Sequence, residues 1–235
     1  GKDLEITDAG GTVSVDVSSL ANEDLDGDTK IHFEKNPNDN IIRFDIGGNE
    51  QWVMEGPILH SKNSGYSVFI GENSGKSDDL SENRNVFIGY RSGYSNNTGS
   101  HNTFSGYQSG FYSTTGSFNT FTGYQAGYEN STGYHNTFTG YMAGEKNTTG
   151  MNNTFSGLYS GRQNSTGQDN TFIGFQSGYT NTSGLKNTAL GFLAGYDGAT
   201  LYNRTAIGYN AQNTASNQVR IGNTSLTSIG GFAAW

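Results

Sequence analysis

The sequence predicts an all-β protein whose main part is a parallel β-roll, that is, a β-solenoid of about nine coils. A marker glycine, preceded by Phe-x in most copies, recurs along most of the chain, with one step of eighteen residues and then seven steps of seventeen. The chain has 35 glycines and no cysteine, and only 32% of its residues are hydrophobic, which is typical of a thin repetitive fold. The glycines that mark the repeat are Gly71, Gly89, Gly106, Gly123, Gly140, Gly157, Gly174, Gly191 and Gly208.

Residues 1–60 precede the repeats and are expected to form short antiparallel strands. Within residues 1–21, two alternating segments flank Ala9-Gly10-Gly11, and this pattern predicts a β-hairpin or shaft segment. Within residues 22–60, the apolar segments 31–33, 41–46 and 52–54 are separated by turn residues. They predict a small N-terminal β-meander that serves as a neck.

The repeat region spans residues 61–212. One copy, residues 119–135, reads Asn-Thr-Phe-Thr-Gly-Tyr-Gln-Ala-Gly-Tyr-Glu-Asn-Ser-Thr-Gly-Tyr-His. Gly, Asn, Ser and Thr are poor helix formers, whereas Thr-Phe-x-Gly-Tyr favours a short strand. Asn-Ser/Thr-Thr-Gly favours a turn in which glycine adopts a positive φ. Seventeen residues therefore predict one coil with two short strands and two corners.

Positions in the unit are numbered here from the marker glycine, which is position 0. Position +3 is always serine or alanine, and position −2 is phenylalanine in seven copies and then Ala189 and Ala206. Because side chains alternate along a strand, position −2 is expected to fill the coil, and positions −3 and −1 to face a partner. A coil this thin buries little apolar area for the residues it orders, so symmetric association of several chains is expected.

The charge of the chain is concentrated before the repeats. Residues 1–60 hold 13 acidic and 4 basic residues, whereas residues 61–235 hold 8 acidic and 9 basic residues. No basic stripe favours nucleic acid, and no apolar run approaches the roughly 20 residues that cross a bilayer. Neither nucleic-acid binding nor membrane insertion is expected. Gly1 without a signal peptide indicates a processed or trimmed piece.

Residues 85–89, Asn-Val-Phe-Ile-Gly, and residues 205–208, Thr-Ala-Ile-Gly, resemble the head repeats of trimeric autotransporter adhesins, whose motif is close to Asn-Ser-Val-Ala-Ile-Gly. The resemblance implies a YadA-like left-handed β-roll of three chains, although the unit is longer here. The repeats are more closely similar to Gly/Asn/Thr-rich fibre proteins of Bacteroidota and their phages, in which they precede an endosialidase-type intramolecular chaperone.

The C-terminal segment, residues 213–235, looks like the transition that precedes that chaperone, which is missing here. It contains Asn-Gln-Val-Arg-Ile-Gly-Asn, with the degenerate marker Gly222, and ends in Ser-Ile-Gly-Gly-Phe-Ala-Ala-Trp. The resemblance implies an extracellular protein: a cell-surface, secreted, or virion or injection-system fibre.

One acidic segment is a candidate metal site. Asp24, Asp26 and Asp28 surround Gly27, which suits part of an oxygen-rich calcium loop. The alternative is a solvated acidic turn, which the absence of flanking helical patterns favours. No other cofactor is expected, and His101 and His135 are expected to point outward, unpaired.

Two sets of side chains are candidates for ligand binding. Aromatic residues recur at position +5, where they either hold glycans or form a ladder that stabilises the roll: Tyr94, Phe111, Tyr128, Tyr179 and Tyr196. The pair at positions −6 and −5 varies most between copies, as a recognition surface on a constant frame would. This second set includes Phe118, Tyr134 and His135, and the alternative is that these residues are unconstrained turn tips.

The sequence therefore predicts a structural, non-enzymatic segment of a trimeric fibre that spans distance and presents an attachment surface to cell-surface glycans or another cell. Such a fibre is a surface adhesin, or a tail fibre of a phage or contractile injection system. One alternative is a glycan-binding or polysaccharide-cleaving solenoid, although cleavage needs clustered acids. Another is ice binding through Thr120-x-Thr122 and Thr137-x-Thr139, a pattern that other copies interrupt.

Overall fold

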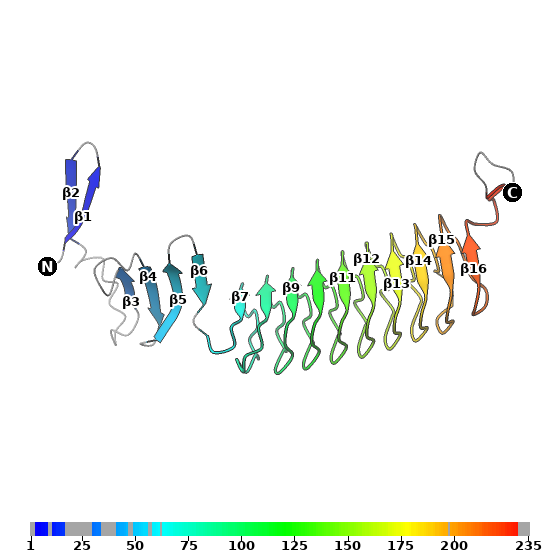
Figure 1. Cartoon of the computed structure of the whole chain (residues 1–235), viewed down its shortest axis with the longest axis horizontal. Coiled ribbons are helices and arrows are strands. Elements are labelled where there is room, and N and C mark those ends of the chain that lie inside the picture. The colour runs from blue at the N-terminus through cyan, green and yellow to red at the C-terminus, as the bar shows by residue number, and fades with distance from the viewer. Residues whose placement is uncertain are drawn as a thin grey trace. The chain divides into compact units, whose positions relative to one another are not determined.

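The computed structural model describes residues 3–8, 11–16, 30–33, 41–46, 49–55, 58–61, 63–196 and 198–229. This part of the chain is all-β, with sixteen strands and no helix. A helical segment with the length and apolar character of a membrane span is accordingly absent from the described residues. The chain divides into two compact units, Gly1–Asn63 and Ser64–Trp235 (Figure 1).

The first unit contains two antiparallel sheets. Strand β1 (Asp3–Asp8) pairs with β2 (Gly11–Asp16), with Asp3 opposite Asp16. The second sheet has four strands in chain order: β3 (Lys30–Phe33), β4 (Ile41–Ile46), β5 (Asn49–Glu55) and β6 (Ile58–Ser61). Val53 of β5 is buried.

The second unit is a parallel β-solenoid of about nine coils, as the repeat predicts. Ten strands of three residues pair in parallel, in chain order, in one sheet (Figure 1). Phenylalanine lies opposite phenylalanine in the register, as Phe121 does with Phe138. The strands are β7 (Val68–Ile70), β8 (Val86–Ile88), β9 (Thr103–Ser105), β10 (Thr120–Thr122), β11 (Thr137–Thr139), β12 (Thr154–Ser156), β13 (Thr171–Ile173), β14 (Thr188–Leu190), β15 (Thr205–Ile207) and β16 (Val219–Ile221).

Each coil has one strand, so the expectation of two strands per coil is wrong. Position +2 adopts a left-handed conformation, as in Gln125 with φ 50°, and position +4 does so again, as in Gly127 with φ 60°. Two left-handed residues so close together bend the chain, and an extended segment cannot form there. Backbone hydrogen bonds between coils join this returning half instead, such as the bond from Gly110 N to Ala126 O at 3.0 Å.

A ladder of phenylalanine rings at position −2 fills the interior, as predicted. From Phe87 to Phe172, consecutive ring centroids are 4.8–5.0 Å apart and the ring planes differ by at most 11°. Each of these side chains is fully buried. Stacked aromatic pairs contribute about 0.5–1.5 kcal/mol each beyond the area that they bury. Ala189 and Ala206 continue the buried row.

Small residues at position +3 face this ladder from the opposite side of the coil. The Ser92 hydroxyl donates to Phe104 O in the next coil at 3.2 Å, and the Ser109 hydroxyl donates to Phe121 O at 3.1 Å. Ala126 and Ala143 occupy the same position and are fully buried. Only a small side chain fits between the turn and the strand, which explains the strict preference for serine or alanine.

Buried asparagines at position −4 link each coil to the next. The Asn119 Oδ1 atom accepts the backbone N–H of Asn136 at 3.0 Å, and its Nδ2 atom donates to Gly133 O at 2.8 Å. The row consists of Asn85, Asn102, Asn119, Asn136, Asn153, Asn170 and Asn187. A second buried row at position +7 joins Asn130, Asn147, Asn164 and Asn181 by amide–amide bonds of 2.7 Å.

The outer face of the ten-stranded sheet is exposed in the single chain. At position −1, the β9–β12 strands carry serine or threonine, whereas the strands nearer both ends carry isoleucine or leucine. These apolar side chains are 37–51% exposed: Ile70, Ile88, Ile173, Leu190, Ile207 and Ile221. The apolar face expected from the sequence is therefore limited to the end coils.

Candidate functional site

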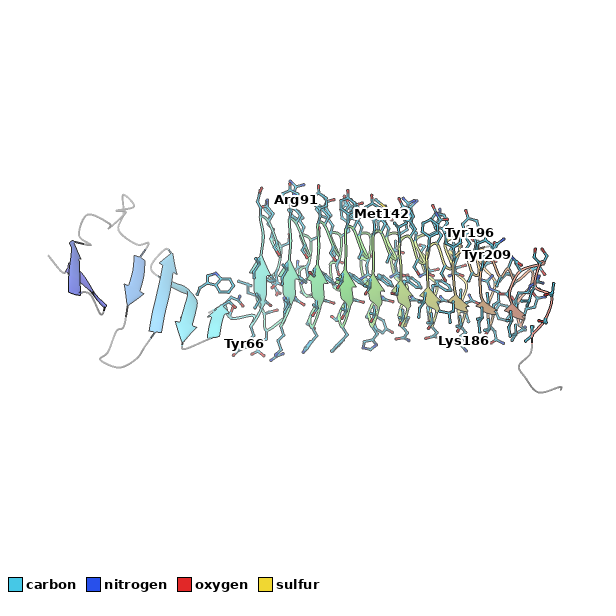
Figure 2. The ribbon with its side chains drawn as sticks, turned by 90° about the horizontal axis from the view of Figure 1, so that it is seen from above. Tyr66, Arg91, Met142, Lys186, Tyr196 and Tyr209 are labelled. Atoms are coloured by element: carbon cyan, nitrogen blue, oxygen red, sulfur yellow. The ribbon has the colours of Figure 1, made fainter. Side chains whose placement is uncertain are left out.

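The coils present side chains at two corners, at positions −5 and +2. Both positions are left-handed in every repeat, although none of their residues is glycine. Figure 2 shows Tyr66 and Lys186, at position −5, along one edge of the solenoid, and Arg91 and Met142, at position +2, along the opposite edge. Because the coils stack at a fixed spacing, each corner forms a regular row of side chains.

The aromatic residues predicted at position +5 form a row beside the +2 corner. Tyr94 stacks on Phe111 at 4.9 Å and 4°, and Phe111 stacks on Tyr128 at 5.3 Å and 20°. Tyr179 and Tyr196 stack farther along, at 5.5 Å and 13°. Burial, the largest cause, raises the pKa of the Tyr128 hydroxyl above its ordinary value.

A charged pair interrupts this row where Glu145 and Arg162 take position +5. The Arg162 Nε atom forms an ion pair with the Glu145 carboxylate, and its Nη1 atom donates to the Tyr179 hydroxyl at 3.1 Å. The guanidinium also lies 5.1 Å from the centre of the Tyr159 ring. The hydrogen bond to Glu145 raises the pKa of Arg162 above its ordinary value, so this network is charged and internally satisfied.

Stacking makes the position +5 row a poor surface for sugars. A pyranose packs its C–H groups against the face of an aromatic ring, where the electron density is greatest. In this row the faces cover one another, and solvent meets mainly ring edges and hydroxyl groups. The geometry favours the alternative stated for this row, a ladder that stabilises the stack of coils.

A further row of mostly aromatic residues lies at position +1 and was not singled out as a site from the sequence. Its members from the third coil onward are 37–62% exposed: Tyr107, Tyr124, Tyr141, Leu158, Phe175, Phe192 and Tyr209. The Gly-Tyr pair of the repeat was the sequence signal for this row, but the sequence does not show that the tyrosine at position +1 faces outward. Ile207 and Tyr209 line one shallow pocket with Ile221 and Leu226, so positions −1 and +1 are neighbours across the glycine row.

The residues predicted at positions −6 and −5 come together in a corner patch, defined here as His101, Phe118, Tyr134 and His135. Phe118 is 54% exposed and Tyr134 is 40% exposed. His101 stacks on Phe118 at 4.9 Å and 13°, but the planes of Phe118 and His135 differ by 52°. Tyr134 meets His135 nearly at right angles, at 5.1 Å and 77°. Rings in this patch are therefore not closed into a parallel ladder.

The two histidines of the patch point outward, as predicted, and both are exposed. The prediction that they are unpaired is wrong, because both pack against Phe118 and the His101 Nδ1 atom lies 3.2 Å from the Ser100 hydroxyl. These rings stack because the left-handed corner aligns the side chains at position −5 of successive coils. The imidazoles lie two coils apart, about 10 Å at the usual strand spacing, too far to share a metal ion.

The candidate calcium ligands Asp24, Asp26 and Asp28 lie outside the described residues. Within the residues that are described, no group of three or more His, Cys, Asp or Glu side chains is arranged to hold a metal. Asp78 has a structural role, since it accepts the side-chain amides of Asn85 and Asn96 at 3.0 Å each. Asp169 accepts the amide of Asn152 at 3.0 Å.

The threonines of the outer sheet face are in register. Position −3 is threonine in seven consecutive strands, each paired with the next: Thr103, Thr120, Thr137, Thr154, Thr171, Thr188 and Thr205. A second threonine follows at position −1 in β10 and β11. These strands present an ordered array of methyl and hydroxyl groups.

Comparisons with protein-family models, with curated proteins and with solved structures found no significant match to this chain. The geometry of its own residues is thus the basis for assigning a function.

Proposed function

We propose that this chain is a non-enzymatic segment of a trimeric extracellular fibre. The fibre spans distance and presents an attachment surface, either as a surface adhesin or as a tail fibre of a phage or contractile injection system. One observation carries the proposal: a single chain leaves large side chains exposed at position +1 from the third coil onward, and isoleucine or leucine exposed at position −1 in the coils nearer both ends. Soluble monomers rarely expose a continuous apolar patch larger than a few hundred Å².

Copies of the same chain fit these rows better than an unrelated partner does. The rows extend over nine steps between β7 and β16, about 43 Å at the usual strand spacing. A partner that covers them must be equally long and regular, as a parallel copy is. Cyclic symmetry about an axis along the solenoid keeps each coil at the same height in every copy.

The chemistry of the two rows matches in the middle coils and in the two coils of β13 and β14. In β10 and β11, threonine at position −1 accompanies Tyr124 or Tyr141 at position +1. In β13 and β14, Ile173 or Leu190 accompanies Phe175 or Phe192. Copies aligned at the same height would therefore pair polar segments with polar segments and apolar segments with apolar ones.

The remaining parts of the chain have supporting roles in this proposal. The β1–β2 pair is the shaft segment, the β3–β6 sheet is a meander that forms the neck, and residues 213–235 are the transition that follows the roll. Each would trimerise with the solenoid.

Light scattering of the purified chain under native conditions tests the assembly. A homotrimer has three times the chain mass of 25.2 kDa, about 76 kDa. A mass near one chain would refute the trimer. Incubation with a panel of polysaccharides tests the claim that the segment is non-enzymatic, because a structural segment releases no reducing ends.

The threonine array supports a second candidate function, ice binding. Seven threonines in register provide the regular hydroxyl and methyl spacing that an ice surface requires. The two candidates exclude each other, because positions −3 and −1 share one face that the trimer covers. A monomer that lowers the freezing point below the melting point of ice would support ice binding, and a trimer without this effect would exclude it.

A further inference from the structure

We infer that Asp78 and Arg204 are charged end caps of the asparagine rows and fix where these rows start and stop. The inference goes beyond the proposed function, because both caps act within one chain and do not depend on the trimer. In a stack of similar coils, an end coil that repeats the interior sequence leaves hydrogen-bonding groups that a further coil would fill. Repeat proteins therefore need terminal units that differ from the interior ones.

The asparagine rows have a direction. At each step of the +7 row the later coil donates and the earlier coil accepts, as Asn147 Nδ2 does to Asn130 Oδ1 at 2.7 Å. The −4 row has the same direction, because Asn119 Oδ1 accepts the backbone N–H of Asn136 in the next coil at 3.0 Å. The start of such a row needs acceptors alone, and its end needs donors alone.

Asp78 meets the requirement for the start. It occupies position +7 of the first coil, and its carboxylate accepts hydrogen bonds but donates none. The Oδ2 atom accepts Nδ2 of Asn85 and of Asn96 at 3.0 Å each, so it starts both rows. The Oδ1 atom accepts the Leu80 backbone N–H at 2.8 Å and Asn83 Nδ2 at 3.0 Å. Four N–H groups thus converge on a side chain that needs no coil before it.

Arg204 meets the requirement for the end. It occupies position −4 of the coil that contains β15, where the seven preceding coils have asparagine. Its backbone N–H and its Nε atom donate to Asn187 Oδ1 at 3.1 and 3.2 Å, and its side chain has no acceptor for a later coil. In the coil that follows, Gln218 Oε1 accepts the Thr214 N–H of its own loop at 2.9 Å, so the row does not resume.

The glycine at position +7 of the β14 coil makes room for this cap. Arg204 is buried, and a Cβ atom on Gly198 would lie 2.6 Å from its Nη1 atom. The guanidinium therefore takes the space that an asparagine side chain occupies in the earlier coils. Two departures from the repeat, Gly198 and Arg204, fit each other in the same place.

The charges of the caps match the orientation of the amides between them. The amide oxygens of both rows face later coils, so the negative ends of their dipoles point towards Arg204. At the other end, the amide nitrogens of Asn85 and Asn96 face Asp78. An anion at the positive end and a cation at the negative end stabilise aligned dipoles, as at the ends of a helix.

A departure from asparagine inside a row has a different result. Ser113 replaces asparagine at position +7 of the third coil, and both Ser113 Oγ and Asn96 Oδ1 are buried without a hydrogen-bond partner. Asp78, in contrast, uses both of its carboxylate oxygens. Replacement at the start of the rows thus satisfies the neighbouring amides, whereas replacement inside a row does not.

The test installs the asparagine of the interior coils at each cap and follows hydrogen–deuterium exchange of the purified chain by mass spectrometry. Asp78→Asn turns an N–H group towards other N–H groups, so exchange is expected to become about tenfold faster in β7 and β8. Arg204→Asn leaves the space beside Gly198 unfilled, and a similar change is expected in β14 and β15. In both variants, β11 should keep its wild-type protection.

Matched controls remove the same charges next to the caps. The hydrogen bonds that Asp79 accepts from Ser81 and Asn83 all go to its Oδ1 atom, so Asp79→Asn keeps their acceptor. Lys186→Asn removes a positive charge at an exposed corner where other coils have asparagine. Both control variants are expected to exchange as the wild type does in every coil.

Faster exchange that is confined to the coils nearest each cap, and is absent from the controls, supports the inference. Wild-type protection in either cap variant overturns it, and so does an equal effect of a cap variant and its control. Loss of protection throughout the solenoid in either cap variant also overturns it, since a cap acts on the coils nearest to it. A light-scattering mass of one chain refutes the trimer and leaves the caps intact.

Discussion

At the residue scale, hydrogen bonds of buried asparagines stabilise the solenoid, which has no thick apolar core of the kind found in a globular protein. Each asparagine at position −4 uses both ends of its amide, as Asn119 does with Asn136 N and Gly133 O. A net contribution of roughly 0.5–1.5 kcal/mol per hydrogen bond accumulates over the coils. Asparagine at position +7 was interpreted as turn chemistry from the sequence, and position −4 was given no role, because a buried amide cannot be distinguished from an exposed one by pattern.

The asparagine row at position +7 has a gap at Ser113. The Asn96 Oδ1 and Ser113 Oγ atoms are buried there without a hydrogen-bond partner, and Asn130 begins the continuous part of the row. The backbone is unchanged across the gap, since Ser113 N bonds to Gly110 O at 3.0 Å and Asn130 N bonds to Gly127 O at 3.0 Å.

We therefore expect Ser113→Asn to stabilise the protein. The new amide would donate to Asn96 Oδ1 and accept from Asn130 Nδ2, as the neighbouring asparagines do. Two net hydrogen bonds add about 1–2 kcal/mol to the free energy of unfolding, which urea titration measures. Ser113→Ala, which removes an unsatisfied hydroxyl without closing the gap, is the control and should be nearly neutral. A Ser113→Asn variant that is less stable than the wild type would contradict this account of the row.

At the element scale, the strand was predictable and the returning half of the coil was not. Thr-Phe-x-Gly-Tyr carries β-branched and aromatic side chains, and the three-residue strands lie there. The left-handed residues at positions −5 and +2 include Phe118, Met142 and Lys186, which have no preference for that conformation. Contacts between coils impose it, so no single coil reveals it.

The glycines divide into two groups that the repeat does not distinguish. Those at positions 0 and +4 have positive φ, whereas the glycine of the Thr-Gly turn at position +10 does not, contrary to the prediction. This turn glycine is needed for close approach. A Cβ atom on Gly150 would lie 2.2 Å from Asn147 Oδ1 and 2.5 Å from Gly167 O of the next coil.

Gly150→Ala is therefore expected to destabilise the solenoid by about 2 kcal/mol or more, because the methyl group separates two coils and disturbs both asparagine rows. Thermal and urea unfolding measure the loss. Thr132→Ala, at an exposed turn position, is the control and should change stability by less than about 0.5 kcal/mol. A stable Gly150→Ala protein would show that the coils can move apart at this point.

At the scale of the whole molecule, the solenoid follows from the period alone, whereas the candidate site does not. Sequence variation between copies at positions −6 and −5 singled out Phe118, Tyr134 and His135, and the structure places them side by side. This variation carries no information on ring orientation, which separates the corner patch from the stacked row of Tyr94 and Phe111. Stacking angles arise from packing between coils and are accessible only in three dimensions.

The proposed assembly makes a prediction for one exposed leucine. Leu190, at position −1, is 45% exposed in the single chain and would be covered in the trimer. Leu190→Glu buries an unpaired carboxylate at the interface and is expected to shift the light-scattering mass from about 76 kDa towards the single chain of 25.2 kDa. Leu185→Glu is the matched control, because Leu185 is 39% exposed at position −6 and lies outside the interface. Equal masses for both variants would place the interface elsewhere.

The most direct test of the central claim, that three parallel chains cover positions −1 and +1, is an electron cryo-microscopy structure of the purified chain at side-chain resolution. We expect a threefold axis along the solenoid, with Leu190 of one copy and Phe192 of its neighbour in contact at the same height. A solitary solenoid, or an assembly that leaves these two positions in solvent, would contradict the claim.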